Sequence, residues 1–158
     1  MLSLHNTALG DCGVPVRMGE AMSRHTTFRI GGPAELFAAP RTEEELVALL
    51  AACKRDGLPY FILGKGSNLL VGDGGIPGLT VAMEGLSSVR VEENTIHAQA
   101  GASLSAVCLA ARDAGLAGLE FAYGIPGQVG GGVYMNAGAY GGELRDVLAG
   151  TVHCLDEE

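Results

Sequence analysis

The sequence predicts an α+β fold that is divided into two lobes. Residues 34–83 alternate short apolar strands with a capped helix, and a hairpin and a second capped helix follow residue 85. Two glycine-rich segments, about sixty residues apart, each come after one of these compact units. We therefore expect a first lobe over residues 1–84 and a second lobe over residues 85–158.

The composition is that of a folded, acidic protein. The chain has 158 residues, 47% of them hydrophobic, and a mean hydropathy of +0.26, so it can bury a sizeable core and disorder is not expected. Its 18 acidic and 10 basic residues give a formal net charge of −8. A nucleic-acid-binding protein needs basic residues concentrated on one face, so this balance argues against that class.

The first lobe should contain three short strands after an irregular or helical lead-in over residues 1–24. Residues 34–39 form an apolar run that ends at a proline, which is typical of a strand. The runs at residues 60–63 and 79–83 have the length and composition of buried strands, because both are rich in aliphatic and aromatic side chains and are bounded by glycine or proline.

A helix is predicted between the first two of these strands. Thr42 and Glu45 have the spacing of a capping box, in which a hydroxyl and a carboxylate satisfy free backbone N–H groups. Apolar residues then recur at helical spacing, basic residues follow at Lys54 and Arg55, and Gly57 ends the pattern.

The second lobe should begin with a β-hairpin and a helix. Residues 89–91 and 95–100 flank a polar turn, which predicts the hairpin. Ser103 precedes an amphipathic stretch that ends near Gly115, which predicts the helix and its N-cap. We expect residues 144–155 to begin new strands.

The first glycine-rich segment, residues 64–71, follows the predicted strand at residues 60–63. The carboxyl end of such a strand is where open α/β sheets bind ligands. The segment is neither a Walker motif nor G-x-G-x-x-G, because Lys65 precedes the second glycine and Leu69 stands where a third glycine would be. Its free backbone N–H groups, its polar side chains and the Lys65 charge still suit a diphosphate, whereas the alternative is a polar turn.

The second glycine-rich segment spans residues 123–143. Glycine at this density weakens a regular helix or strand, because each glycine loses more backbone entropy on folding. Its apolar neighbours argue against a flexible linker. We interpret it as a packed ligand-binding loop, with a structural turn or a hinge as the alternatives. Together the two segments predict one extended, phosphate-bearing cofactor held between the lobes.

Four stretches of the chain resemble the UDP-N-acetylenolpyruvylglucosamine reductase (UDP-N-acetylmuramate dehydrogenase) family. The four stretches occur in the right order, the resemblance extends over about residues 25–150, and any one stretch alone would be a weak signal. They are Thr27-Phe28-Arg29-Ile30-Gly31-Gly32-Pro33-Ala34, Gly64-Lys65-Gly66-Ser67-Asn68-Leu69-Leu70-Val71, Gly124-Ile125-Pro126-Gly127-Gln128-Val129-Gly130-Gly131 and Asn136-Ala137-Gly138-Ala139-Tyr140-Gly141.

The resemblance implies an FAD-binding fold of the vanillyl-alcohol-oxidase type, with two α+β lobes around the cofactor. It also implies that NADPH reduces the flavin, which then reduces the enolpyruvyl ether of UDP-N-acetylglucosamine in peptidoglycan synthesis. The residues that it places against FAD are Gly64, Lys65, Gly66, Ser67, Asn68, Gly127, Val129, Gly130, Asn136 and Gly138. Since these lie in loops, we expect valine at Gly66 or Gly130 to abolish flavin binding while the fold survives.

No catalytic residue is assigned. In the family, the catalytic arginine, serine and glutamate come after the part that the resemblance covers, and no serine of this chain has a matching context. The chain is therefore expected to be the N-terminal FAD-binding portion without the substrate domain, inactive alone and prone to self-association. A non-catalytic flavin-binding fragment and another oxidoreductase of the same fold are the alternatives.

Metal and membrane sites are not expected. The four cysteines stand singly, and His153 and Cys154 are too close together for a zinc ligand pair. The N-terminus lacks the pattern of a signal peptide, and no apolar run is long enough to cross a membrane. These observations predict a cytoplasmic protein with reduced thiols.

Overall fold

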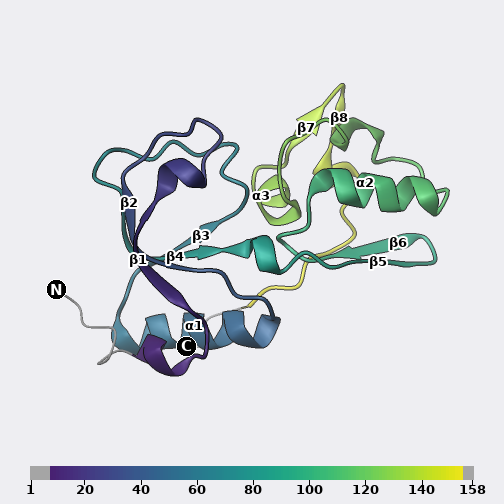
Figure 1. Ribbon diagram of the computed structural model, residues 1–158. Coiled ribbons are helices and arrows are strands. Elements are labelled where there is room, and N and C mark those ends of the chain that lie inside the picture. The colour runs from purple at the N-terminus through teal and green to yellow at the C-terminus, as the bar shows by residue number, and fades with distance from the viewer. Residues whose placement is uncertain (1–7, 155–158) are drawn as a thin grey trace.

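A computed structural model describes residues 8–154, and Figure 1 shows its elements in two groups side by side. The first lobe contains a four-stranded sheet and helix α1, up to strand β4. The second lobe contains a hairpin, helices α2 and α3 and a small two-stranded sheet, from strand β5 onwards. The mixed composition predicted from the sequence is confirmed, while the boundary near Gly85 stays a prediction.

The sheet of the first lobe has the order β1-β2-β4-β3, with bounds Val16–Ala21, Pro33–Ala38, Ile76–Ala82 and Tyr60–Leu63. Strands β2, β4 and β3 are parallel to one another, and β1 is antiparallel to β2. The prediction of a lead-in without strands is wrong for β1, and the part of that lead-in before residue 8 lies outside the described residues. Strand β1 lies at the sheet edge with mostly exposed side chains, so its sequence lacks a buried alternation.

Helix α1 spans Glu43–Asp56 and is capped as the sequence predicts. The Thr42 hydroxyl accepts a hydrogen bond from the Glu45 N–H at 3.2 Å. The Glu45 carboxylate in turn accepts one from the Arg41 N–H, one residue earlier than in a standard capping box. Gly57 ends the helix in the left-handed conformation, with φ of 62°.

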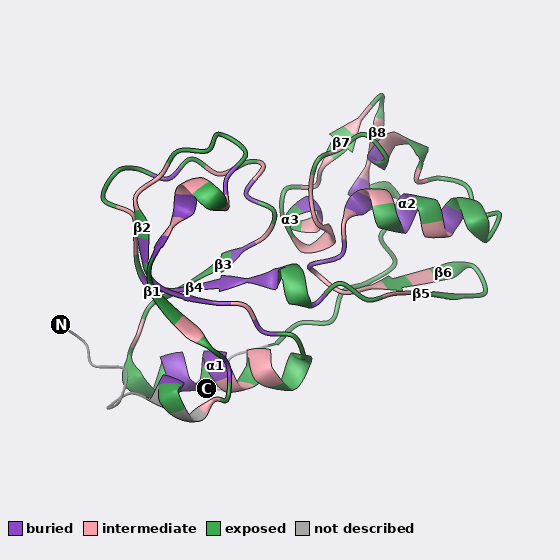
Figure 2. Ribbon diagram, viewed as in Figure 1, coloured by how far each residue is buried: buried purple, intermediate pink, exposed green. Residues whose placement is uncertain are grey.

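Residues of β2 and β4 are buried (Figure 2), and the buried side chains of the sheet form an apolar layer on each of its faces. On one face, Leu36, Leu79 and Val81 pack with the apolar side of α1, including Leu49. On the other face, Phe37, Leu63 and Ala82 pack under the loops that follow the strands, together with Met22 and Val71. The first glycine-rich segment therefore packs on this second layer through Leu69 and Val71.

One polar group in this second layer has no partner. Thr80, in β4, is fully buried, and its hydroxyl makes no hydrogen bond with the described residues. We expect Thr80→Val to raise the free energy of unfolding by about 1 kcal/mol, because it removes an unpaired buried hydroxyl at almost constant volume. Urea denaturation measures this change.

Thr42→Val is the matched control for that substitution. It removes the hydroxyl that caps α1, so it should lower the free energy of unfolding by about 1 kcal/mol. If both variants were destabilised equally, the Thr80 hydroxyl would have a partner in solution.

The second lobe contains the predicted hairpin and helix. The hairpin is formed by β5, Val89–Glu92, and β6, Thr95–Ala98, and α2 spans Leu104–Asp113. The Ser103 hydroxyl caps α2 by accepting a hydrogen bond from the Ala106 N–H at 3.1 Å, as predicted.

Two expectations for the second lobe are wrong. Val129–Tyr134, within the predicted loop, forms the short helix α3, because Gly130 and Gly132 pack closely against Ala100 and Leu104. After the two-residue strands β7, Gly138–Ala139, and β8, Gly142–Glu143, the chain makes a 3-10 turn at Leu144–Asp146. No strand follows in residues 147–154, and residue 155 lies outside the described part of the chain.

Candidate cofactor site

The first glycine-rich segment lies at the carboxyl end of β3. No backbone N–H of residues 64–68 donates a hydrogen bond to another group in the described part of the chain. Lys65 and Asn68 are exposed, and Lys65 forms no ion pair with any carboxylate in residues 8–154. The segment therefore presents donors and one positive charge to a ligand.

A second loop of the first lobe, residues 25–33, holds this segment in place. The Thr27 N–H donates to the Gly66 carbonyl at 3.1 Å, and the Gly32 N–H donates to the Gly72 carbonyl at 3.0 Å. Gly66 has φ of 66°, and a Cβ there would lie 2.0 Å from the His25 carbonyl oxygen. The absence of a side chain at Gly66 is thus explained by packing within the protein, and valine there would not leave the fold intact.

A hydrogen bond between His25 and Glu20 anchors the loop of residues 25–33 to β1. The His25 imidazole lies 2.8 Å from the Glu20 carboxylate, whose side chain is 9% exposed, and Arg17 lies 3.4 Å from the same carboxylate. The hydrogen bond with His25 is the largest effect on Glu20 and lowers its pKa, with burial acting against it and Arg17 reinforcing it.

This depressed pKa predicts a loss of stability in acid. A carboxylate of this kind stabilises the fold above its unfolded pKa, and the contribution is lost as the pH falls from about 4.5 through the folded value. In Glu20→Gln, the free energy of unfolding should be lower than that of the parent at neutral pH. It should also fall less than that of the parent when the pH is lowered from about 5 to about 3. Urea titrations at several pH values test this, with Glu93→Gln in the exposed β5–β6 turn as the matched control; an unchanged pH profile in Glu20→Gln would contradict it.

The second glycine-rich segment is held by its own lobe. The Val129 N–H donates to the Ala102 carbonyl and the Gly130 N–H to the Ala100 carbonyl, both at 2.8 Å. A Cβ at Gly130 would lie 2.9 Å from the Ala100 Cβ, so here too packing explains the glycine. Valine at Gly130 is therefore also expected to disturb the fold.

Gly127 and Gly131 are among the glycines of this segment that have room around them. A Cβ at Gly127 would meet its nearest atom, the Leu104 Cδ1, only at 3.6 Å, and one at Gly131 would meet nothing within 4 Å. Their lack of a side chain has no packing reason in the described residues, and this is the property expected of a backbone that a ligand approaches.

The structure brings the two glycine-rich segments together. A Cβ at Gly64 would lie 3.3 Å from Oε1 of Gln128, which comes from the other lobe. This Oε1 atom is buried and has no hydrogen-bond partner in the described residues. Gln128 lies in the third of the four motifs, residues 124–131, but is not among the predicted site residues. Its signal in the sequence is a long polar side chain that directly follows a glycine within a glycine-rich segment.

The fourth motif has a structural explanation. The Asn136 side chain donates to the Glu143 carboxylate at 2.7 Å and accepts from the Arg145 N–H at 3.0 Å. A Cβ at Gly138 would lie 2.7 Å from the Gly142 carbonyl oxygen. Asn136 and Gly138 thus form and close the β7–β8 hairpin, and their contact with a cofactor stays a prediction.

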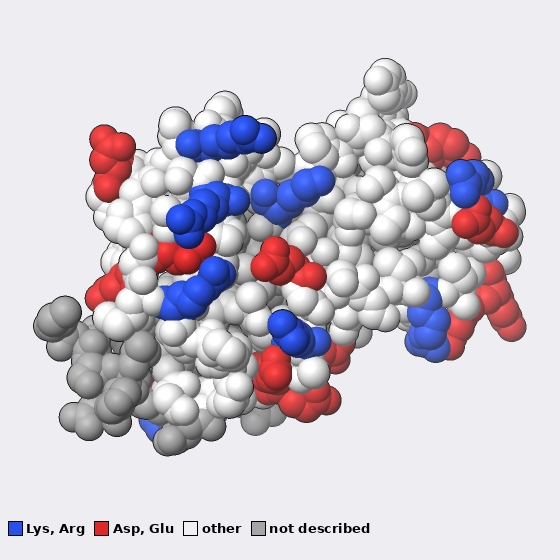
Figure 3. All heavy atoms as spheres, in the orientation of Figure 1, with Lys and Arg blue, Asp and Glu red and all other residues white. Residues whose placement is uncertain are grey.

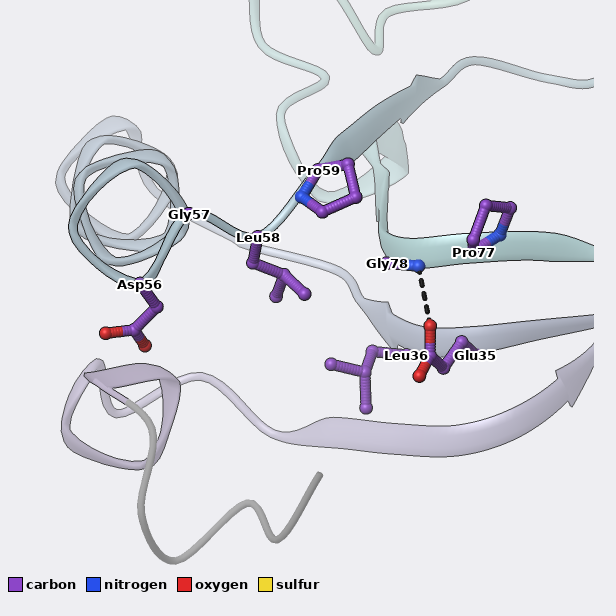
Figure 4. Close-up of a pocket in the computed structure, with 8 residues that line it drawn as sticks. All are labelled: Glu35, Leu36, Asp56, Gly57, Leu58, Pro59, Pro77 and Gly78. Atoms are coloured by element: carbon purple, nitrogen blue, oxygen red, sulfur yellow. Dashed lines mark hydrogen bonds between the residues drawn. The ribbon is translucent and has the colours of Figure 1, made fainter. Parts of the chain in front are cut away.

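A cavity of about 260 Å³ lies at the other end of the sheet (Figure 4). Pro59 and Pro77 line it where β3 and β4 begin, whereas Gly64 follows the end of β3. Glu35 also lines it and accepts a hydrogen bond from the Gly78 N–H at 2.8 Å. This cavity is separate from the glycine-rich segments.

The first lobe has more basic residues than the second lobe. Figure 3 shows Lys and Arg side chains spread over the first lobe. In the sequence, Arg17, Arg24, Arg29, Arg41, Lys54, Arg55 and Lys65 precede Gly85, and Arg90, Arg112 and Arg145 follow it. Among the described residues, no cluster of side chains could hold a metal ion, and no helix is long and apolar enough to cross a membrane.

Comparisons with known proteins point to a flavin-binding family. A family profile described as "FAD binding domain" matches residues 34–156. The UDP-N-acetylenolpyruvoylglucosamine reductase of Lactobacillus delbrueckii subsp. bulgaricus is 49% identical over 147 residues, which are 92% of this chain and 50% of that protein. The enzyme of the same name from Caldanaerobacter subterraneus subsp. tengcongensis is 49% identical over 140 residues, covering 89% and 46%. The chain spans about half the length of these curated relatives.

Solved structures agree with this. The UDP-N-acetylenolpyruvylglucosamine reductase (MurB) from Thermus caldophilus superposes with a TM-score of 0.66 at 36% identity, over 84% of this chain and 46% of that chain. A solvent-stable cholesterol oxidase gives a TM-score of 0.63 at 17% identity, over 80% of this chain and 25% of that chain. The second likeness concerns the fold alone, and it agrees with the FAD-binding fold class predicted from the motifs.

Proposed function

Because the chain belongs to the FAD-binding-domain family, we propose that it holds the diphosphate of FAD between residues 64–68 and 127–131. The observation that carries the proposal is the contact of the two glycine-rich segments at Gly64 and Gln128. At this contact the two lobes meet. The first lobe contributes the unbonded backbone N–H groups of residues 64–68, and the second lobe contributes the open backbone at Gly127 and Gly131.

The residues present fit such a group. The unbonded N–H groups of residues 64–68 can donate to phosphate oxygens, and the Lys65 ammonium adds positive charge. The open surroundings of Gly127 and Gly131 allow close backbone approach. The predicted site residues that this supports are Gly64, Lys65, Gly66, Ser67, Asn68 and Gly127, although packing within the protein also explains the missing side chain of Gly66. Val129, Gly130, Asn136 and Gly138 have structural partners.

We further propose that the chain provides the flavin-binding part of a UDP-N-acetylenolpyruvoylglucosamine reductase, which acts in the cytoplasm in peptidoglycan synthesis. Bound FAD would supply hydride transfer from NADPH to the enolpyruvyl group of the UDP-sugar substrate. The residues of this chain bind and orient the cofactor. Identity to a solved reductase at 36%, against 17% for the solved oxidase, favours this substrate over that of another flavoenzyme with the same fold.

We assign no catalytic residue and propose that the chain alone binds FAD without turning over the substrate. The hydroxyls of Ser103 and Ser105 have structural partners: Ser103 caps α2, and the two hydroxyls lie 3.2 Å apart. We also propose self-association, because large apolar side chains of the second lobe are exposed, including Tyr134 at 88% and Tyr140 at 97%. Sedimentation of the purified chain measures it, and a strictly monomeric protein would contradict it.

Flavin binding tests the central proposal. FAD should bind the unaltered chain and raise its melting temperature, since a ligand at a hundredfold excess over its Kd stabilises the folded state by about 2.7 kcal/mol. Gly64→Val should raise the Kd for FAD about tenfold or more, because the side chain blocks the backbone. The melting temperature without FAD should stay close to that of the parent, since a Cβ at Gly64 meets only the Gln128 side chain.

Gly150→Val is the matched control, because a Cβ there meets nothing within 4 Å and the residue lies outside the proposed site. It should bind FAD as the parent does. A folded Gly64→Val variant with the parental Kd would show that the first glycine-rich segment does not contact the cofactor.

A further inference from the structure

Gln128 carries a polar atom whose position the fold alone does not explain. Its Oε1 atom is buried, lies against Gly64 and accepts no hydrogen bond from the described residues. A buried acceptor without a partner is costly, because it loses its hydrogen bonds to water and gains none in exchange. Such an atom is expected to have a partner in the functional state of the protein.

None of the neighbouring backbone N–H groups donates to it. The Gly64 N–H makes no hydrogen bond with Oε1, and the next two N–H groups along the chain, those of Val129 and Gly130, donate to Ala102 and Ala100. The main-chain carbonyl of Gln128 accepts from the Gly132 N–H at 2.8 Å, which fixes the backbone but leaves Oε1 free.

The other glutamine of the chain shows what a structural glutamine looks like here. The Gln99 side chain accepts from the Ser88 N–H and donates to the Glu43 carboxylate, both at 2.9 Å. Among residues 8–154, Thr80 has the other unpartnered buried side-chain atom, but it lies inside the sheet, away from the contact between the glycine-rich segments. Of these groups, only Gln128 Oε1 lies in the proposed cofactor site.

We propose that the Gln128 side-chain oxygen accepts a hydrogen bond from a hydroxyl group of bound FAD. This inference rests on the proposed function, because it needs the diphosphate to lie between residues 64–68 and 127–131. Phosphate oxygens are acceptors at neutral pH, so they cannot satisfy another acceptor. The nearest donors in FAD are the hydroxyls of the two sugar-like groups that flank the diphosphate, ribityl on the flavin side and ribose on the adenine side.

Gln128→Met tests the proposal, because methionine has a similar length and its thioether is only a weak hydrogen-bond acceptor. The binding of FAD, FMN and ADP is measured by calorimetry, and the melting temperature is measured without ligand. We expect the Kd for FAD to rise roughly three- to tenfold, which corresponds to the loss of one hydrogen bond. Without ligand, the melting temperature should be unchanged or higher, because an unpaired buried acceptor has been removed.

The two smaller ligands identify the hydroxyl. If it belongs to the ribityl chain, the substitution weakens FMN and leaves ADP unchanged; if it belongs to the ribose, it weakens ADP and leaves FMN unchanged. Gln99→Met is the matched control: it should lower the melting temperature, because it breaks two hydrogen bonds, and leave the Kd for FAD unchanged.

Two results would overturn the assignment of Gln128. One is an unchanged Kd for FAD in a folded Gln128→Met variant, and Gln128→Leu repeats this test with a different shape. The other is a lower melting temperature without ligand together with equal weakening of all three ligands, because a structural role produces that pattern. Failure of the unaltered chain to bind FAD would instead overturn the proposed function itself, and this inference with it.

Discussion

Replacing Gly66 with alanine should lower the free energy of unfolding by about 2–5 kcal/mol. Gly66 adopts the left-handed conformation at φ of 66°, which strains any residue with a Cβ. The added Cβ would also lie 2.0 Å from the His25 carbonyl oxygen, so the loop of residues 25–33 would have to move. Since Thr27 is bonded to Gly66, the first glycine-rich segment would move with it, and FAD binding should be lost as a consequence.

Urea denaturation measures the effect, and Gly57→Ala is the matched control. Gly57 has almost the same φ, 62°, but a Cβ there meets nothing within 4 Å. It should therefore cost only the strain, about 1–2 kcal/mol. The difference between the two variants isolates the contact with His25. Equal losses at the two positions would mean that this contact gives way without cost.

Gly66 also shows why a glycine in a ligand-binding motif is ambiguous when only the sequence is known. The sequence indicates that a side chain is absent but does not indicate which neighbour excludes it. At Gly66 and Gly130 that neighbour is the protein's own backbone or side chain, and at Gly127 and Gly131 it is neither. The motifs could therefore locate the site, while the roles of its glycines depend on contacts between distant segments.

The predictable part of the fold is the part that local interactions determine. Helices α1 and α2 could be predicted because Thr42 and Ser103 cap them through bonds three residues away. Helix α3 could not be predicted, because its glycine content disfavours a helix and packing against Ala100 and Leu104 outweighs that preference. Strand β1 could not be predicted for a similar reason. It forms because it pairs with β2, and its own sequence pattern does not indicate a strand.

The candidate site divides in the same way. Residues 64–68 could be predicted, because a glycine-rich segment after a strand is a local pattern. The importance of the Gln128 side chain could not, because it depends on a contact with Gly64, which is far away in the sequence and lies in the other lobe. The role of the loop of residues 25–33 as a support for Gly66 depends likewise on tertiary contacts.

Phe37→Ala should lower the free energy of unfolding by about 3–5 kcal/mol, which is a large share of the 5–15 kcal/mol typical of a folded domain. Phe37 is 0% exposed and is among the largest fully buried side chains in the described residues. Its ring lies 4.5 Å from the His25 ring, and the Arg17 guanidinium lies over it at 4.6 Å. The substitution therefore leaves a cavity under the loop that holds Gly66.

Phe61→Ala is the matched control, because Phe37 and Phe61 are both paired with Thr80 in the sheet, but Phe61 lies on the edge strand β3 and is 36% exposed. It should cost clearly less, about 1 kcal/mol, since water can already reach its side chain. Urea denaturation compares the two variants, and FAD titration follows whether the cavity also weakens the cofactor site. Because His25 rests on Phe37 and its carbonyl packs on Gly66, we expect Phe37→Ala to raise the Kd for FAD and Phe61→Ala to leave it close to the parental value. A Phe37→Ala variant that loses stability but keeps the parental Kd would show that the loop of residues 25–33 holds its position without the ring beneath it.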